Sequence, residues 1–119
     1  MYAITRQANL LSRLGDLECL ILLVSCICHD LDHPGYNNIY QINARTELAL
    51  RYNDISPLEN HHCSIAFRLL EHPECNIFKN FSRDTFKILL KQFRLPNENG
   101  EEERKVCFPQ IIRLYNKAI

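Results

Sequence analysis

The sequence predicts an all-α fold. In the segment that begins at Ser56, the residues of one helix face recur at steps of three and four: Leu58, His62, Ile65, Ala66 and Leu69. This spacing matches a helix of about 3.6 residues per turn, so the face is apolar and carries His62. No segment alternates apolar and polar residues as a half-buried strand does, and no internal repeat is visible. Turn and capping residues divide the chain into segments of helical length.

The first two predicted helices lie on either side of Gly15. Residues 1–14 carry three leucines at helical spacing, which weakly indicates an amphipathic helix. The next helix begins with Asp16 as its N-cap and Glu18 in its first turn. Leu17–Cys28 is apolar on nearly every side, and a helix of that kind is buried all round. We therefore expect neighbouring helices around it, and this chain supplies too few of them.

Two short helices and one well-marked helix follow. The short helices are predicted over residues 39–44 and 45–50, after a turn at Pro34-Gly35. The well-marked helix starts at Ser56–Glu59, where serine offers an N-cap, proline takes the first helical position and glutamate completes a capping box. It closes at Glu71-His72-Pro73, because the residue before a proline is disfavoured in a helix.

The last helix with a clear inner face begins at Ser82 and runs to about Gln92. Four apolar residues form that face: Phe86, Leu89, Leu90 and Phe93. Residues 96–105 are polar and rich in turn formers, which predicts a solvated, disordered loop. A short helix is expected over residues 109–117.

Composition limits the classes of function. The chain has 119 residues, enough for one small domain or a piece of a larger one. Its formal net charge is zero, so electrostatics gives no case for binding nucleic acid or an anionic membrane. The longest apolar run, Cys19–Cys28, is too short to span a bilayer. The N-terminus has no basic region followed by an apolar core, so we expect no secretory signal and a cytoplasmic location.

The six cysteines predict reduced thiols rather than a disulfide framework. Four of them lie inside apolar helical patterns, and the sequence contains no C-x-x-C pair and no export signal. We therefore expect the cysteines to pack as small core residues.

The segment Cys28–Gly35 carries the candidate chemistry. Two imidazoles and two carboxylates fall within five residues, directly after the buried helix. A buried carboxylate without a partner is costly, and a divalent metal ion held by His29 and Asp30 would compensate it. His33 lies on the same side if the helix continues. The alternative is a solvated last turn, in which His29 interacts with the helix dipole and Pro34-Gly35 end the helix.

Three stretches together resemble the catalytic domain of class I cyclic-nucleotide phosphodiesterases: His29–Asn38, Glu47–Ala49 and Tyr52–His62. Within them, Pro34–Asn38 and Ile55–Pro57 most resemble the high-affinity, cGMP-specific branch (type 9). The motifs are separate and colinear. The resemblance implies an all-α fold, namely a partial helical bundle of the phosphodiesterase (HD-type) catalytic domain.

The resemblance also implies a site with two divalent metals, zinc and a second ion that is magnesium or manganese. In the family, the residue matching His29 binds the zinc, and the one matching Asp30 contacts both ions. Positions matching His33 and Glu59 support the water bound to the metals. The implied activity is two-metal hydrolysis of a 3′,5′-cyclic nucleotide, cGMP more than cAMP, to the 5′-monophosphate in cyclic-nucleotide signalling.

Four side chains of the Ser56 helix also have structural interpretations. Glu59 serves both as capping-box partner and as support for the metal-bound water. His61 and His62 are expected to be helix residues satisfied by buried hydrogen bonds. Asn60 is expected to bond only backbone.

The resemblance covers residues 16–92 and leaves residues 1–15 and 93–119 unmatched. Three family features have no match: an upstream His-Asn-x-x-His segment with the proton-donating histidine, a downstream metal-binding aspartate, and the glutamine and aromatic clamp that holds the purine. We therefore expect a partial catalytic domain with a divergent tail of loop and short helix. Such a chain would bind metal weakly and be inactive alone, whereas the full-length protein could form a homodimer.

Two alternatives remain open at this point. A non-catalytic truncated product would act only by associating with a full-length subunit, through its uncovered Leu17–Cys28 helix. In a purely structural alternative, His29-Asp30 ends a helix in a bundle and binds no ligand.

Overall fold

The computed structural model describes residues 2–9, 12–95 and 105–106. Helices dominate this part of the chain, which confirms the predicted all-α fold. They are α1 (Tyr2–Gln7), α2 (Asp16–Cys28), α3 (Asn38–Asn43), α4 (Glu47–Arg51), α5 (Pro57–Glu71) and α6 (Arg83–Phe93).

One pair of two-residue strands was not predicted. β1 (Arg94–Leu95) follows α6 directly and pairs antiparallel with β2 (Lys105–Val106). Arg94 lies opposite Val106, and Leu95 lies opposite Lys105. Two residues are too few to show the alternation from which a strand is recognised in sequence. The helix expected over residues 109–117 lies outside the described residues.

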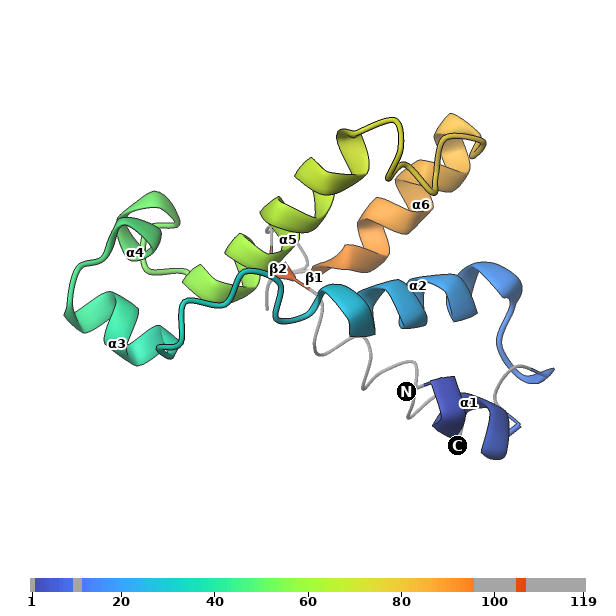
Figure 1. The fold of residues 1–119 in the computed structure, drawn as a ribbon, viewed down its shortest axis with the longest axis horizontal. Coiled ribbons are helices and arrows are strands. Elements are labelled where there is room, and N and C mark those ends of the chain that lie inside the picture. The colour runs from blue at the N-terminus through green and yellow to red at the C-terminus, as the bar shows by residue number, and fades with distance from the viewer. Residues whose placement is uncertain (1, 10–11, 96–104, 107–119) are drawn as a thin grey trace.

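The helices form a packed body and a smaller lobe (Figure 1). In the body, α2 contacts both α5 and α6. In the lobe, α3 and α4 contact each other, and both also contact α5. α5 is thus the element that joins the two parts, and it positions the loops on either side of it.

The core lies between α2, α6 and the loop that connects α5 to α6. Its buried centre consists of Ile21, Val24, Phe78 and Leu89, of which Leu89 is fully buried. Burying one such side chain contributes about 1.5–3 kcal/mol. The partly buried residues around this centre include Cys28, the last residue of α2. The core therefore holds the end of α2 from which the candidate segment departs.

α2 is covered on two sides but not all round. Its second side packs Leu22 against Leu14, with Cys19 and Cys26 alongside. Ile27, near its C-terminal end, is 78% exposed. The prediction of burial on every side is therefore wrong for Ile27, because the described elements cover only the two faces that carry the clusters.

The start of α2 differs from the prediction by one residue. Gly15, with φ −70° and ψ 160°, is the N-cap, and Asp16 is already helical. The Gly15 N–H donates to Oε2 of Glu18 at 3.1 Å. Glu18 therefore satisfies the first backbone donor of the helix, as an acidic side chain in the first turn often does.

The two later helices begin in different ways. α5 starts at Pro57 as predicted, but Ser56 is left-handed, with φ 42° and ψ 59°, and makes no side-chain cap bond. The predicted serine cap is therefore wrong. α6 starts at Arg83, one residue after the predicted boundary, and Oγ of Ser82 caps it by accepting from the N–H of Thr85 at 3.1 Å.

The short helices begin where side chains cap them. Oδ1 of Asn37 accepts from the N–H of Tyr40 at 2.9 Å, so α3 starts one residue before the predicted boundary. The hydroxyl of Thr46 is the acceptor at the start of α4, which begins two residues after the predicted boundary. Arg45, just before this cap, is left-handed with φ 49°, which explains the delay.

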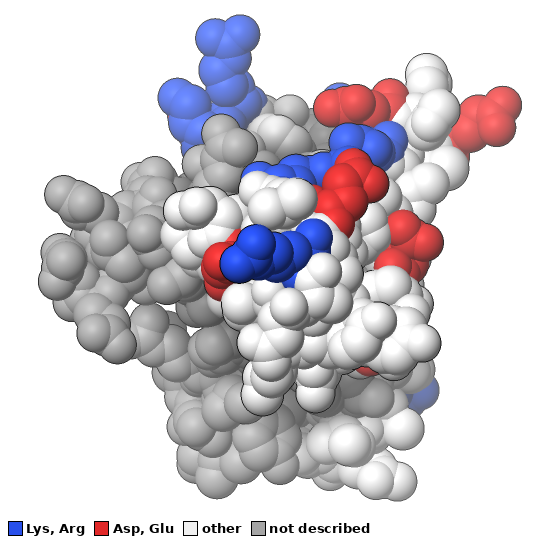
Figure 2. All heavy atoms as spheres, turned by 90° about the vertical axis from the view of Figure 1, so that its left-hand side faces the viewer, with Lys and Arg blue, Asp and Glu red and all other residues white. Residues whose placement is uncertain are grey.

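Four of the described cysteines pack against the two apolar clusters as predicted, but Cys75 is exposed, so its predicted place in the core is wrong. None of the described cysteines forms a disulfide, and burial raises the pKa of the Cys26 and Cys28 thiols, which keeps them protonated. Acidic and basic side chains are interspersed on the face shown in Figure 2. Arg51 of α4 pairs with Glu47 one turn earlier. Among the described residues, no helix has both the length and the apolar character needed to cross a membrane.

Candidate metal centre

The segment after α2 turns back within a few residues. His29 is still helical, with φ −61° and ψ −30°, but α2 ends there and does not continue to His33. Asp32 and Gly35 then adopt left-handed conformations, with φ of 58° and 89°. Glycine tolerates this conformation because it lacks a Cβ, whereas for Asp32 it costs about 1–2 kcal/mol. Contacts to the rest of the protein must stabilise the turn.

Two consecutive histidines of α5 provide those contacts. Nε2 of His61 lies 2.8 Å from Oδ2 of Asp32, and Nδ1 of His62 lies 2.7 Å from the carbonyl oxygen of Leu31. Both imidazoles are buried, which confirms the predicted buried hydrogen bonds. The other nitrogen of His61, Nδ1, is buried and has no hydrogen-bond partner among the described residues.

The bond to Leu31 fixes the tautomer of His62. A carbonyl oxygen only accepts, so Nδ1 of His62 carries the hydrogen and donates it. Nε2 of the neutral ring then keeps its lone pair, and it lies 4.0 Å from Oδ1 of Asp30. The ring of His33 stacks on that of His62, with centroids 5.5 Å apart. One potential ligand atom from each of Asp30, His33 and His62 lies within 4.8 Å of the others.

The second oxygen of Asp30 faces another imidazole. Nδ1 of His29 donates to the carbonyl oxygen of Cys26 at 2.7 Å, so in the neutral ring the lone pair lies on Nε2. That Nε2 lies 3.2 Å from Oδ2 of Asp30. Two acceptors so close repel each other unless a cation or a proton lies between them. The side chain of Asp30 is 65% exposed, so the buried carboxylate expected from the sequence is wrong. Its carboxylate nevertheless has an imidazole Nε2 on each side, and nitrogen with carboxylate oxygen is a donor set that suits zinc and similar divalent ions.

His33 has the opposite tautomer. Its Nδ1 accepts a hydrogen bond from the N–H of Gly35 at 2.9 Å. The neutral ring therefore carries its hydrogen on Nε2, which can donate to a water molecule but has no lone pair for a metal. When the three rings are neutral, Nε2 of His33 is therefore a donor, whereas Nε2 of His29 and of His62 can accept a hydrogen bond or bind a metal.

Glu59 forms a hydrogen bond with Asn38, the first residue of α3. Nδ2 of Asn38 donates to Oε2 of Glu59 at 2.9 Å, and Oδ1 of the same amide accepts from the N–H of Leu58 at 3.0 Å. The predicted capping box between Ser56 and Glu59 is therefore wrong, and Asn38 caps α5 instead. Glu59 lies three residues before His62, so the two share one side of the helix.

Sequence reasoning found part of this arrangement. His29 contacts Asp30, and ligand atoms of Asp30 and His33 lie within 4.8 Å of each other, whereas Glu59 lies on the same helix as His62. The proximity of His62 to Asp30 was missed, although the position of His62 on the inner face of its helix was a usable signal. Nothing local marked Asn38, whose bonds span 20 and 21 residues of sequence.

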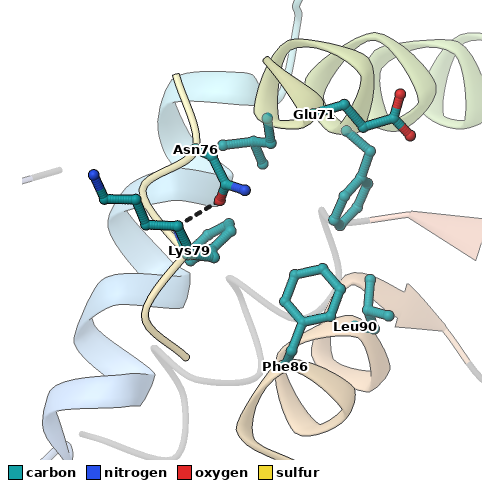
Figure 3. A pocket seen from close by; sticks show the side chains of 8 residues that line it. Glu71, Asn76, Lys79, Phe86 and Leu90 are labelled. Carbon is teal, nitrogen blue, oxygen red and sulfur yellow. Dashed lines mark hydrogen bonds between the residues drawn. The ribbon is translucent and has the colours of Figure 1, made fainter. Parts of the chain in front are cut away.

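Asn60 behaves as predicted, since its amide donates only to backbone, to the carbonyls of Ile55 at 2.8 Å and Ser56 at 3.2 Å. A cavity of about 470 Å³ lies elsewhere, at the C-terminal end of α5 (Figure 3). Phe86 and Leu90 of α6 line one side of it, and Asn76 lines the other. None of the candidate metal residues lines this cavity, so it is separate from the centre.

Comparison with known families identifies the chain. The family described as 3′5′-cyclic nucleotide phosphodiesterase matches residues 1–95. The chain belongs to this family. Its members generally use divalent metals, and Asp30, between His29 and His62, is a place where one could bind. The matched range begins at residue 1, so it includes residues 1–15, which the motifs in the sequence had left outside the resemblance.

Individual relatives agree with the family match. The human high affinity cGMP-specific 3′,5′-cyclic phosphodiesterase 9A is 62% identical over 87 residues, which are 73% of this chain and 15% of the human protein. The 3′,5′-cyclic-nucleotide phosphodiesterase regA of Dictyostelium discoideum is 48% identical over 89 residues, 75% of this chain and 11% of that protein. This chain therefore spans only a small part of the length of these relatives.

A solved structure shows the same fold. The phosphodiesterase domain of the RhoPDE fusion protein from the choanoflagellate Salpingoeca rosetta superimposes with a TM-score of 0.62 at 47% sequence identity. The match covers 64% of this chain and 24% of that domain chain. The helices of this chain are thus arranged as in a phosphodiesterase catalytic domain.

Proposed function

We propose that this chain carries part of the active site of an enzyme that hydrolyses a 3′,5′-cyclic nucleotide to the 5′-monophosphate in cyclic-nucleotide signalling. The observation that carries the proposal is the position of the Asp30 carboxylate, which has Nε2 of His29 3.2 Å from one oxygen and Nε2 of His62 4.0 Å from the other. A carboxylate between two imidazole nitrogens is a donor set that binds divalent cations. The family match supports hydrolysis of a cyclic nucleotide as the reaction.

Four residues would act on the metals and their water. His29 and Asp30 would bind zinc, and Asp30 would also contact a second ion, magnesium or manganese. When bound, the two ions supply a nucleophile at neutral pH and neutralise charge on the phosphate. His33 would donate from Nε2 to water at the site, and Glu59 would accept from it. His62 would hold the loop after α2 through its bond to the Leu31 carbonyl, and its Nε2 would face the cation from the side opposite His29.

The proposed substrate is cGMP rather than cAMP. Its support is the higher identity to relatives named cGMP-specific, 62% for the human protein, than to the mouse 3′,5′-cyclic-AMP phosphodiesterase 4C, which is 52% identical over 67 residues. A relative from Plasmodium falciparum is named as a dual cAMP and cGMP enzyme at 50% identity. The cytoplasmic location and the homodimer expected from the sequence stay predictions.

We further propose that the 119-residue chain alone is inactive. His29 and Asp30, with Nε2 of His62 near them, would leave water to hold most of each ion, and metal affinity falls as the number of protein ligands falls. The sequence also shows no match for the histidine that donates a proton to the leaving group. Losing such a general acid alone lowers the rate by about 100- to 10,000-fold.

The test compares the chain with a version extended on both sides to the length of a relative's catalytic domain, using labelled cGMP with zinc and magnesium. We expect turnover only by the extended version. In that version, His29→Ala and Asp30→Ala should remove bound metal and turnover, whereas His72→Ala, an exposed histidine beyond α5, should leave both unchanged. Unchanged metal content in His29→Ala and Asp30→Ala would contradict the proposal.

One observation favours the non-catalytic alternative as a second candidate. Ile27 is an apolar residue of α2 and is 78% exposed, so α2 offers an apolar surface that a full-length subunit could cover. Co-sedimentation of the chain with a full-length subunit, abolished by Ile27→Lys, would support this alternative. Absence of any complex would remove it.

A further inference from the structure

Asn38 connects α3 of the lobe to α5, the helix that carries Glu59 and His62. It is the first residue of α3, it is half-buried, and its amide bonds to two consecutive residues of α5. Oδ1 accepts from the N–H of Leu58 at 3.0 Å, and Nδ2 donates to Oε2 of Glu59 at 2.9 Å. In the part of the chain that the structure describes, the Glu59 carboxylate has no other hydrogen bond.

We propose that Asn38 is a positioning residue for the metal centre, which orients the Glu59 carboxylate toward water at the site. The inference rests on the proposed function, because it assumes that Glu59 accepts from that water. Asn38 itself touches neither substrate nor metal and acts through Glu59.

The geometry explains why an amide suits this position. A glutamate side chain has three rotatable bonds, so an unanchored carboxylate must be ordered when the site fills. Asn38 holds one oxygen in advance and leaves Oε1 for water. Because the amide is neutral, it fixes the carboxylate without cancelling the negative charge that attracts a cation, as an arginine or lysine would.

The same amide also acts on the backbone. Its bond to Leu58 satisfies a donor at the N-terminus of α5, which Ser56 leaves without a side-chain partner. Any change at Asn38 is therefore expected to affect stability as well as the site. The test has to separate these effects.

Asn60 provides the matched control. It lies in the same first turn of α5, and its amide bonds only to the backbone carbonyls of Ile55 and Ser56. Asn60→Ala therefore removes an asparagine amide from the same turn without touching Glu59.

The experiment titrates the 119-residue chain with Mn²⁺ alone and measures free Mn²⁺ by electron paramagnetic resonance. The variants are Asn38→Ala, Glu59→Gln, their combination and Asn60→Ala, and circular dichroism gives the unfolding midpoint of each sample. Asn38→Ala and Glu59→Gln should each weaken Mn²⁺ binding about 10-fold or more, as loss of a residue that supports a metal site does. The double variant should be no weaker than Glu59→Gln, because both changes remove one function. Asn60→Ala should lower the midpoint yet change the Mn²⁺ Kd by less than about twofold.

A swapped pair keeps the net charge and tests orientation directly. In the variant that combines Asn38→Asp with Glu59→Gln, the amide introduced on α5 can donate to the carboxylate introduced on α3. That carboxylate also keeps an acceptor for the Leu58 N–H. We expect this variant to regain the wild-type midpoint while its Mn²⁺ binding stays weak.

Two patterns would overturn the inference in distinguishable ways. If Asn38→Ala weakens Mn²⁺ binding no more than Asn60→Ala, or if its effect multiplies with that of Glu59→Gln, Asn38 does not act through Glu59 and the proposed function is untouched. If the wild-type chain binds no Mn²⁺, or Asp30→Asn leaves the Kd unchanged, the metal centre itself is wrong and the inference falls with it.

Discussion

His62 donates from Nδ1 to the Leu31 carbonyl and keeps a lone pair on Nε2, 4.0 Å from Asp30. His29 divides its two nitrogens in the same way, with the Cys26 carbonyl as partner. His33 does the reverse, because its Nδ1 accepts from a backbone N–H. Backbone partners therefore decide which imidazole can bind a metal and which can only donate to water.

Replacing His62 by asparagine separates its two roles. An asparagine amide can occupy the place of Nδ1 and still donate to Leu31, but it does not reach the place of Nε2. We therefore expect His62→Asn to keep most of the unfolding midpoint while weakening Co²⁺ binding about 10-fold, measured by the visible absorption of bound Co²⁺. His62→Ala serves as the comparison and should lower the midpoint further, since the buried Leu31 carbonyl loses its donor. Equal Co²⁺ affinity in His62→Asn and wild type would show that Nε2 takes no part in the centre.

α5 and α6 differ in which side chains accept hydrogen bonds from the backbone N–H groups at their N-termini. α6 is capped locally by Ser82, whereas α5 takes its cap from Asn38 on another helix. The backbone of Ser56 is left-handed, which leaves its hydroxyl unused as a cap. Hydrogen bonds thus join α5 to two other segments, to α3 through Asn38 and to the loop after α2 through His61 and His62.

A pair of serine substitutions tests this difference. Ser82→Ala removes a cap bond and should lower the free energy of unfolding by about 1 kcal/mol. Ser56→Ala removes no such bond and should change it by less than about 0.5 kcal/mol. Urea denaturation followed by far-ultraviolet circular dichroism measures both. A larger loss in Ser56→Ala than in Ser82→Ala would contradict the observed caps.

Among the described residues, a small cluster of buried side chains holds the body together. Ile21 and Val24 of α2 meet Leu89 of α6 and Phe78 of the preceding loop. The metal centre depends on this packing indirectly, because the packing fixes the position of the C-terminal end of α2 relative to α5. Ile27, exposed on the same helix, shows that this packing covers only part of the apolar surface.

Two neighbouring residues of α6 test the core. Leu89 is fully buried and Ile88 is 50% exposed. Leu89→Ala should lower the free energy of unfolding by about 2–5 kcal/mol, which is a large share of the stability of a small domain. Ile88→Ala should cost less than about 1 kcal/mol, since much of its side chain already contacts water. Similar losses in thermal or urea unfolding of the two variants would contradict this placement of α6.

Local signals were sufficient for most of the fold. The spacing of apolar residues in α5 and α6, and the proline at the start of α5, depend on contacts within a few residues, so helices could be predicted from them. Cap assignments were weaker. Asp16 and Ser56 were both misassigned, because a capping side chain is recognised by type, while its use depends on backbone angles that the sequence does not display.

The sequence by itself determined the helices, the family resemblance and the residues His29, Asp30, His33 and Glu59, because helical periodicity and short motifs are written in neighbouring positions. Only the tertiary structure decided which nitrogen of each histidine keeps its lone pair, that His62 faces Asp30, and that Asn38 rather than Ser56 caps α5 and holds Glu59. The contacts of His62 and Asn38 depend on hydrogen bonds between segments 20 to 31 residues apart. Such bonds form only once packing of the helices brings the segments together, and no local pattern encodes them.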